Sequence, residues 1–134
     1  MGIEAIGSGV KTRLNTIAGL RVYAMHEIPD TLELPCALIL PGENHYAITF
    51  DAGYDMVVRI IIVISKQDTP SAFNKILDYI ESAGASSIFA AIDGDKTLNA
   101  SCDSSKLSRN FGVGSITWGN ITYLSTEFEL QVWS

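Results

Sequence analysis

Hydrophobic residues recur along this chain at two spacings, one typical of helices and one typical of strands. At the start they fall at steps of three and four, at Ile3, Ile6, Val10, Leu14 and Ile17. That period predicts an amphipathic helix over 3–17, which Gly19 is placed to end. The segment 20–25 is then expected to form a short strand and 26–35 a loop.

The segment 54–65 predicts the strongest strand of the protein. Its even positions are apolar from Tyr54 to Ile64, so one face meets the core throughout. Its odd positions change from Asp55, Val57 and Arg59 to Ile61 and Val63. The second face is therefore expected to be exposed to solvent in the first half of the strand and buried in the second half. We expect the helix that follows to cover the buried half.

Two further strands are predicted before this one. The apolar run 35–40 favours a strand that Pro41 and Gly42 stop, and 45–50 alternates between polar and apolar residues. A turn at 51–53 would then make 41–54 a long hairpin. These segments predict an antiparallel arrangement.

A helix pair is expected in the middle of the chain. Asp68, Thr69 and Pro70 are typical of a helix start. The residues expected on its buried face are Phe73, Ile76, Leu77 and Ile80. A second short helix is predicted over 86–93, ending at Gly94, and 95–105 is expected to be loop.

The C-terminal third predicts two more strands, 107–113 and 121–133. A glycine-rich connection over 112–120 is expected between them, with a tight turn at Gly119 and Asn120. Even positions from Thr122 to Val132 are expected to face the core. The prediction is therefore a single domain, 1–134, of the α+β class: a largely antiparallel sheet with an N-terminal helix and a central helix pair packed on it, and long β-hairpin extensions.

Composition and charge narrow the possible functions. The chain of 134 residues is 47% hydrophobic, which exceeds what one small core requires and indicates surface buried against partners. Its formal net charge is −6 and its nine basic residues are scattered, so they make no stripe that could neutralise phosphates. Sequence-independent binding of DNA is therefore not expected, and only loose passage of DNA past an acidic surface stays open.

Targeting signals and reactive groups are sparse. The first ten residues do not resemble a signal peptide, and the longest apolar run, Ile60–Ile64, is too short to span a bilayer, so we expect a soluble protein with no membrane contact, made in a cytoplasm. Cys36 is expected to be a buried small hydrophobe.

Catalytic chemistry is not indicated. His26 and His45 lie in expected loops or at strand starts. Neither has a nucleophile or carboxylate at a sequence spacing that would indicate a catalytic pair. Asp93–Thr97 lacks the alternating oxygen ligands of a calcium loop, and the cysteines and histidines stand singly, which disfavours zinc. We therefore expect no enzyme activity, no cofactor and no metal.

Aromatic residues near the hairpin tips are better suited to protein contact. The interface candidates are Tyr46, Phe50, Tyr54, Phe111, Trp118 and Trp133. The alternative is that these side chains fold back on their own core. Trp133, near the C-terminus, is expected to dock on its own core or on a neighbour.

Four segments resemble one known family. They are 19–23 (GLRVY), 35–42 (PCALILPG), the helical stretch with Ser87 and Ala90–Ile92, and the ending 119–132. Together these segments, which are spread along most of the chain, resemble the tail-terminator or tail-completion proteins of long-tailed phages with non-contractile tails, found in the neck region of siphophages. They are structural patterns rather than reactive motifs.

The resemblance implies a virion protein that forms a ring of six on the head-proximal end of the tail tube. Such a ring stops tube growth, contacts the head-tail connector or stopper protein, and lets genomic DNA through its lumen. A ring of six would carry a formal charge of roughly −36, six times −6, which would repel DNA. Its subunits would meet through two different patches, for which 41–54 and the sheet edge or helical region are the candidates.

Three alternatives stay open at this point. A head-to-tail stopper or another neck protein would share the resemblance. A small-ligand binding domain or enzyme would need a pocket with convergent polar groups. A regulator directed at host proteins is the third.

Overall fold

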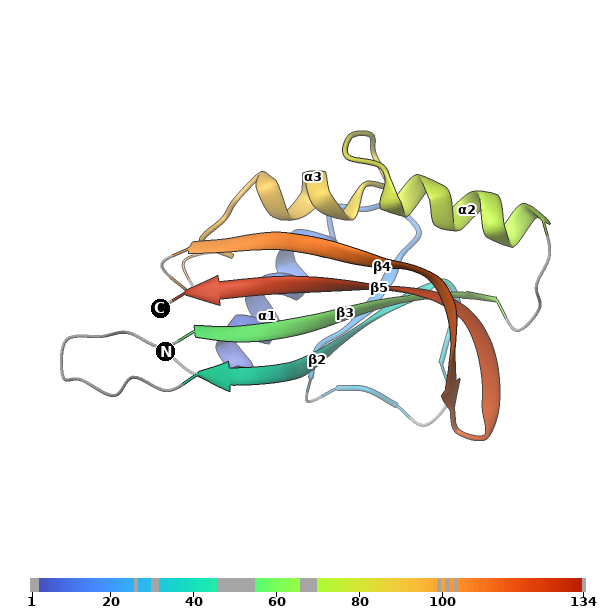
Figure 1. Cartoon of the computed structure of the whole chain (residues 1–134), viewed down its shortest axis with the longest axis horizontal. Coiled ribbons are helices and arrows are strands. Elements are labelled where there is room, and N and C mark those ends of the chain that lie inside the picture. The colour runs from blue at the N-terminus through green and yellow to red at the C-terminus, as the bar shows by residue number, and fades with distance from the viewer. Residues whose placement is uncertain are drawn as a thin grey trace, which may run out of the picture.

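The computed structural model describes residues 3–25, 27–29, 32–45, 55–65, 70–98, 100, 102 and 104–133. The elements are, in order, α1 (Ile3–Leu14), β1 (Arg21–Tyr23), β2 (Cys36–His45), β3 (Asp55–Ser65), α2 (Pro70–Ile80), α3 (Ile88–Asp93), β4 (Ser104–Trp118) and β5 (Ile121–Trp133). The strands form one sheet in the order β1-β2-β3-β5-β4. Only the short β1–β2 pair is parallel. The α+β prediction is confirmed, with α1 behind the sheet and α2 and α3 along its upper side (Figure 1).

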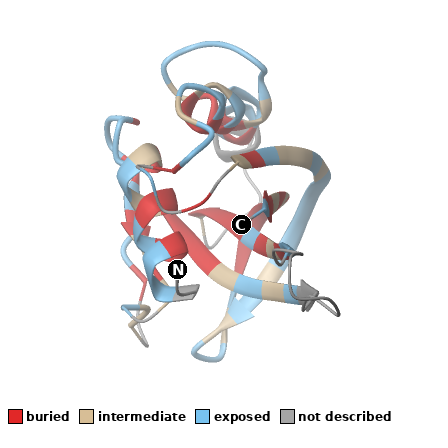
Figure 2. Ribbon diagram, turned by 90° about the vertical axis from the view of Figure 1, so that its left-hand side faces the viewer, coloured by how far each residue is buried: buried red, intermediate tan, exposed pale blue. Residues whose placement is uncertain are grey.

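The main core lies between the helices and one face of the sheet. Ile6, Val10 and Leu14 of α1 are fully buried, as their spacing predicts. The even positions of β3 from Met56 to Ile64 belong to the same cluster. Figure 2 shows the buried residues gathered where α1 meets the sheet, while the outer side of the helix is exposed.

A second, smaller cluster lies on the opposite face, and it corrects one prediction. Ile61 and Val63 are buried there, as their odd positions predict. Their cover is not the following helix, because α2 packs into the main cluster through Ile76 and Tyr79. The cover consists of apolar side chains from the segment before β2 and from the β4–β5 hairpin: Ile28, Leu32, Leu34, Ile116, Trp118, Ile121 and Tyr123. The hairpin bends down over this face (Figure 1).

Strand β2 is one element where we predicted two. It continues from Cys36 through Pro41 to His45, with a register shift between Pro41 and Asn44. The proline is tolerated because β1 pairs only with residues 36–38, so the outer edge of β2 beyond them lies open in the described part of the sheet. The expected turn at 51–53 and the end of the 41–54 hairpin lie outside the described residues.

Strand β4 also exceeds the prediction. The glycine-rich segment 112–118, expected as a connection, is paired with β5 through to Trp118↔Ile121. Glycines depress strand propensity, but pairing with β5 overrides this here. The turn at Gly119 and Asn120 is confirmed, with φ of 58° and 65°, as a two-residue hairpin turn of type I′ requires.

The helices differ from prediction in detail. Helix α1 ends at Leu14. The backbone N–H groups of Thr16 and Ile17 donate to carbonyls three residues earlier, so the chain after the helix forms a tighter 3₁₀-type turn. On α2, Leu77 is 42% exposed and Tyr79 is buried in its place. Helix α3 begins after Ser87, whose hydroxyl accepts from the Ala90 N–H at 3.1 Å. No helix in the described ranges is long and apolar enough to cross a membrane.

Candidate assembly surfaces

The predicted interface residues fall into two groups. Tyr46, Phe50 and Tyr54 lie outside the described residues, and the structure places only the strand ends that flank them, His45 and Asp55. Phe111, Trp118 and Trp133 are described, and they lie at three separate places on β4 and β5. Their role as contacts to a partner stays a prediction.

Phe111 projects from a bulge in β4. The register shifts between Asn110↔Phe128 and Val113↔Thr126, so two residues of β4, Phe111 and Gly112, lie opposite one residue of β5, and β4 holds one extra residue there. Gly112 has a φ of 85°, a left-handed conformation that glycine adopts at little cost. The bulge turns the Phe111 ring outward, and the ring is 53% exposed.

A partly buried hydrogen-bond network holds this bulge. Asn110 Nδ2 donates to Thr126 Oγ1 at 2.8 Å and to the Glu127 carbonyl at 3.0 Å. The Thr126 hydroxyl donates to the Gly112 carbonyl at 2.8 Å, and the Gly112 N–H donates to Asn110 Oδ1 at 2.9 Å. Thr126 is almost completely buried. The bulge is thus a defined feature of the strand, which sequence reasoning missed.

Five consecutive residues of β4, 111–115, are exposed. Val113 among them is 38% exposed, and a Cβ added to Gly114 would meet no atom within 4 Å. In the described part of the sheet β4 pairs only with β5, so its outer edge has no strand neighbour. An exposed apolar edge strand is a ready template for pairing with another chain.

Charged pairs line the sheet face beside this edge. Arg59 Nε and Nη2 each donate to a carboxylate oxygen of Glu127 at 3.0 Å, and this hydrogen bonding raises the pKa of Arg59 above its ordinary value. Arg109 Nε lies 3.4 Å from Glu129 Oε2, and its guanidinium stacks over the Phe111 ring at 4.5 Å from the centroid. Both arginines are thus balanced by a glutamate, and this face offers no excess positive charge to a phosphate.

A small hollow lies between these charged pairs and the bulge. It holds about 240 Å³ and is lined by Arg59, Ile61, Phe111, Gly112 and Glu127 among others. Of its polar lining residues, Arg59 and Glu127 hydrogen-bond to each other and Thr126 hydrogen-bonds within the bulge, while Ser115 and Ser125 complete the polar part of the lining.

Trp118 faces inward, in line with the alternative that aromatic side chains fold back on their own core. Its indole Nε1–H donates to the Pro29 carbonyl at 2.9 Å, and its ring packs on the second cluster. Only part of the side chain remains accessible to a partner, so its main contacts in the described structure are internal.

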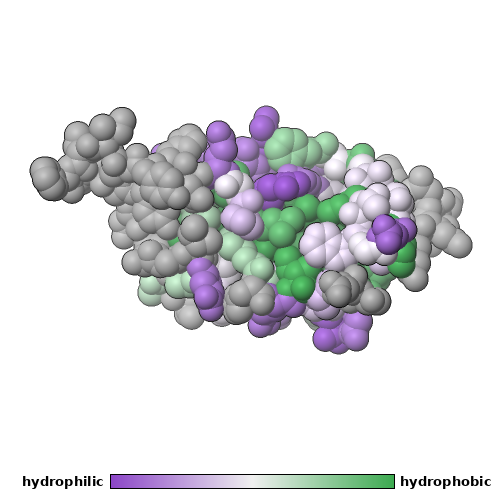
Figure 3. All heavy atoms as spheres, turned by 90° about the horizontal axis from the view of Figure 1, so that it is seen from below, coloured by the Kyte–Doolittle hydropathy of each residue, from purple (hydrophilic) through white to green (hydrophobic). Residues whose placement is uncertain are grey.

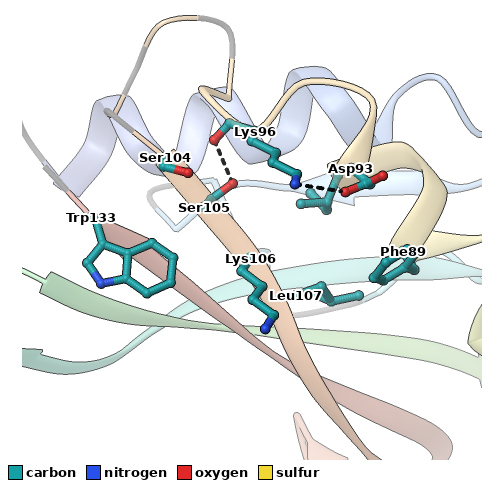
Figure 4. Close-up of a pocket in the computed structure, with 9 residues that line it drawn as sticks. Phe89, Asp93, Lys96, Ser104, Ser105, Lys106, Leu107 and Trp133 are labelled. Atoms are coloured by element: carbon teal, nitrogen blue, oxygen red, sulfur yellow. Dashed lines mark hydrogen bonds and ion pairs between the residues drawn. The ribbon is translucent and has the colours of Figure 1, made fainter.

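Trp133 lies at the opposite end of the sheet. Its side chain is 38% exposed, so docking on its own core is incomplete. It lines a groove beside the start of β4, together with Phe89 and Ile92 of α3 (Figure 4). Phe89 is 39% exposed, whereas Ile88 and Ile92 of the same helix are buried.

Hydrophobic surface also gathers elsewhere on the molecule. Figure 3 shows hydrophobic side chains in the middle of the lower face, with hydrophilic side chains around them. Some of the hydrophobic residues of this chain therefore lie on its surface and not in the core.

Among the described residues no group of three or more His, Cys, Asp or Glu side chains could hold a metal ion. Cys36 and Cys102 are both buried.

No known family model matches this sequence, and no curated protein is significantly similar to it.

Proposed function

We propose that this chain is a structural subunit of a phage tail, a tail terminator that assembles into a ring, of six copies by resemblance, on the head-proximal end of the tail tube. In this role it stops tube growth, joins the tail to the head connector, and lets DNA pass without specific binding. It acts in the virion after synthesis in the host cytoplasm. No catalytic step belongs to the proposal.

The observation that carries the proposal is the open edge of β4. Phe111 and Val113 are exposed on a strand whose outer edge has no neighbour in the described sheet. A soluble monomer tends to cover or charge such an edge, because apolar edges associate. In a subunit that assembles, an open apolar edge can bind a partner, and the partner then covers the edge in the finished particle.

The resembling segments give the assembly its proposed identity. They fall on β1, β2, α3 and β5, which are elements of the sheet and the helix beside it. The resemblance therefore concerns the fold-forming parts of the chain rather than its loops. The formal charge of −6 per chain suits a ring through which DNA slides without sticking.

The test is to add the purified chain to polymerising tail-tube protein of the phage that encodes it. Negative-stain electron microscopy, with the chain gold-labelled, should show label at one end only and shorter tubes as the chain concentration rises. An equal concentration of an unrelated acidic protein should leave tube length unchanged. Label along the tube, or no label, would contradict the proposal. Binding to the connector but not to the tube would assign the chain to a stopper.

A further inference from the structure

A groove beside the start of β4 combines exposed aromatic rings with basic side chains. It holds about 360 Å³. Phe89 of α3 lies at one end and Trp133 of β5 at the other, with Lys106 and Leu107 between them (Figure 4). Both aromatic side chains are more than a third exposed, so the groove offers apolar surface that the subunit itself leaves uncovered.

The rim of this groove is more basic than the molecule as a whole. Lys96 lies 3.5 Å from Asp93, so these two charges balance. Lys106 is exposed and pairs with no described residue. On a chain of net charge −6, this leaves one positive charge beside the two rings that is uncompensated among the described residues. The groove therefore suits a segment with aromatic side chains and one acidic residue.

The chain contains one such segment, residues 46–54, which reads YAITFDAGY. It carries Tyr46, Phe50 and Tyr54, and its single charged residue is Asp51. The register of the sheet places its two ends: Ser104, Trp133, Asp55 and His45 form one row across β4, β5, β3 and β2. The segment thus leaves the sheet at the same end at which the groove lies.

We infer that the groove of one subunit binds segment 46–54 of the next subunit in the ring. The segment leaves from β2 and β3, whereas the groove lies along β4, beyond β5. Two strand spacings, roughly 10 Å, separate β3 from β4. The two patches are different surfaces, as a head-to-tail interface between identical copies requires. This inference rests on the proposed ring.

The groove is tested by the double substitution Phe89→Ala and Lys106→Glu. It removes an exposed ring and reverses the uncompensated charge, so self-association should weaken on the order of 10- to 100-fold. The matched control is Leu77→Ala with Lys75→Glu on α2, which makes the same kinds of change at exposed positions outside the groove. The control should associate as the unmodified chain does, and both proteins should melt at a similar temperature.

The segment 46–54 is tested by the double substitution Tyr46→Ala with Phe50→Ala, which should weaken self-association to a similar extent. Mixing the groove variant with the segment variant is the decisive step. Each variant retains one intact patch, so one copy of each can join through a single interface and then has no intact patch left. The mixture should therefore give a dimer of the two variants, although each alone stays a monomer by light scattering.

Three outcomes would overturn the inference. If the groove variant forms rings like its control, the groove is not an interface, although the proposed function stands. If both variants are monomers and their mixture is too, the two patches do not bind each other. If the unmodified chain never assembles, alone or on tail tubes, the proposed function fails together with this inference.

Discussion

Trp118 donates its indole N–H to the backbone carbonyl of Pro29, with 2.9 Å between nitrogen and oxygen. The bond joins the tip of the β4–β5 hairpin to the segment before β2. It lies beside the second hydrophobic cluster, so the bent hairpin and that segment close over Ile61 together.

Replacing Trp118 by Phe should destabilise the fold by about 0.5–1.5 kcal/mol, because the Pro29 carbonyl loses its donor while most of the ring contact remains. Urea unfolding measures this as a lower midpoint at an unchanged slope. Trp133→Phe is the matched control, since its indole has no hydrogen-bond partner among the described residues, and should change stability by less than about 0.5 kcal/mol. Equal effects of the two substitutions would show that the bond to Pro29 contributes nothing.

Gly42 should resist substitution where Gly114 accepts it. A Cβ at Gly42 would lie 2.8 Å from the Val57 carbonyl oxygen, whereas one at Gly114 would meet nothing within 4 Å. Gly42→Ala must shift the backbone of β2 or β3 and should cost about 1–3 kcal/mol. Gly114→Ala should be neutral or slightly stabilising, because glycine weakens a strand. Thermal melting of both variants measures this difference. An unchanged melting midpoint for Gly42→Ala would refute the close approach of Gly42 to the Val57 carbonyl.

The bulge at Phe111 should depend on the Thr126 hydroxyl. Thr126→Val keeps the shape but leaves the Gly112 carbonyl without its donor and one Asn110 N–H without its acceptor. We expect a loss of about 1–3 kcal/mol. Thr122→Val, at an exposed position of the same strand, should change stability by less than about 0.5 kcal/mol. Chemical denaturation compares the two, and similar values would mean that the network does not hold the bulge.

Cys36 should be inert to alkylation while the protein is folded. Burial raises its pKa from 9.0 to about 12, so the reactive thiolate is scarce at pH 8, and the side chain is also inaccessible. Between pH 9 and 12 the folded state holds a proton that the unfolded state has lost, so this group's contribution to stability falls as pH rises through that window. Mass spectrometry after iodoacetamide treatment should find Cys36 unmodified in buffer and modified in guanidinium. Rapid modification in buffer would contradict the buried placement.

The sequence predicted the parts of the fold that follow a period. The faces of α1 and β3 and the turn at Gly119 were correct, because burial on one side repeats every few residues. The cover of Ile61 and Val63 was assigned wrongly, because which element packs on the second face depends on how the hairpin bends. Pro41 was taken as a stop because a strand's position at a sheet edge is not visible in one sequence.

The candidate surfaces were predicted less well. Phe111 and Trp133 are exposed, but Trp118 is partly buried against its own chain. Phe89 was missed, although a signal existed: Ile88 and Ile92 are one helical turn apart, and Phe89 lies about 100° round the helix from Ile88 and about 60° from Ile92. The bulge beside Phe111 left no signal that pattern reasoning used, because it depends on how Asn110 meets Thr126 across the strands.

Self-association is the central claim, and the native mass of the purified chain tests it most directly. Light scattering should be measured from about 1 µM to about 1 mM, a range that populates even weak interfaces. We expect a closed species near six times the 14.5 kDa of one chain, seen as rings by electron microscopy. A monomer across the whole range that also fails to join tail tubes would contradict the account.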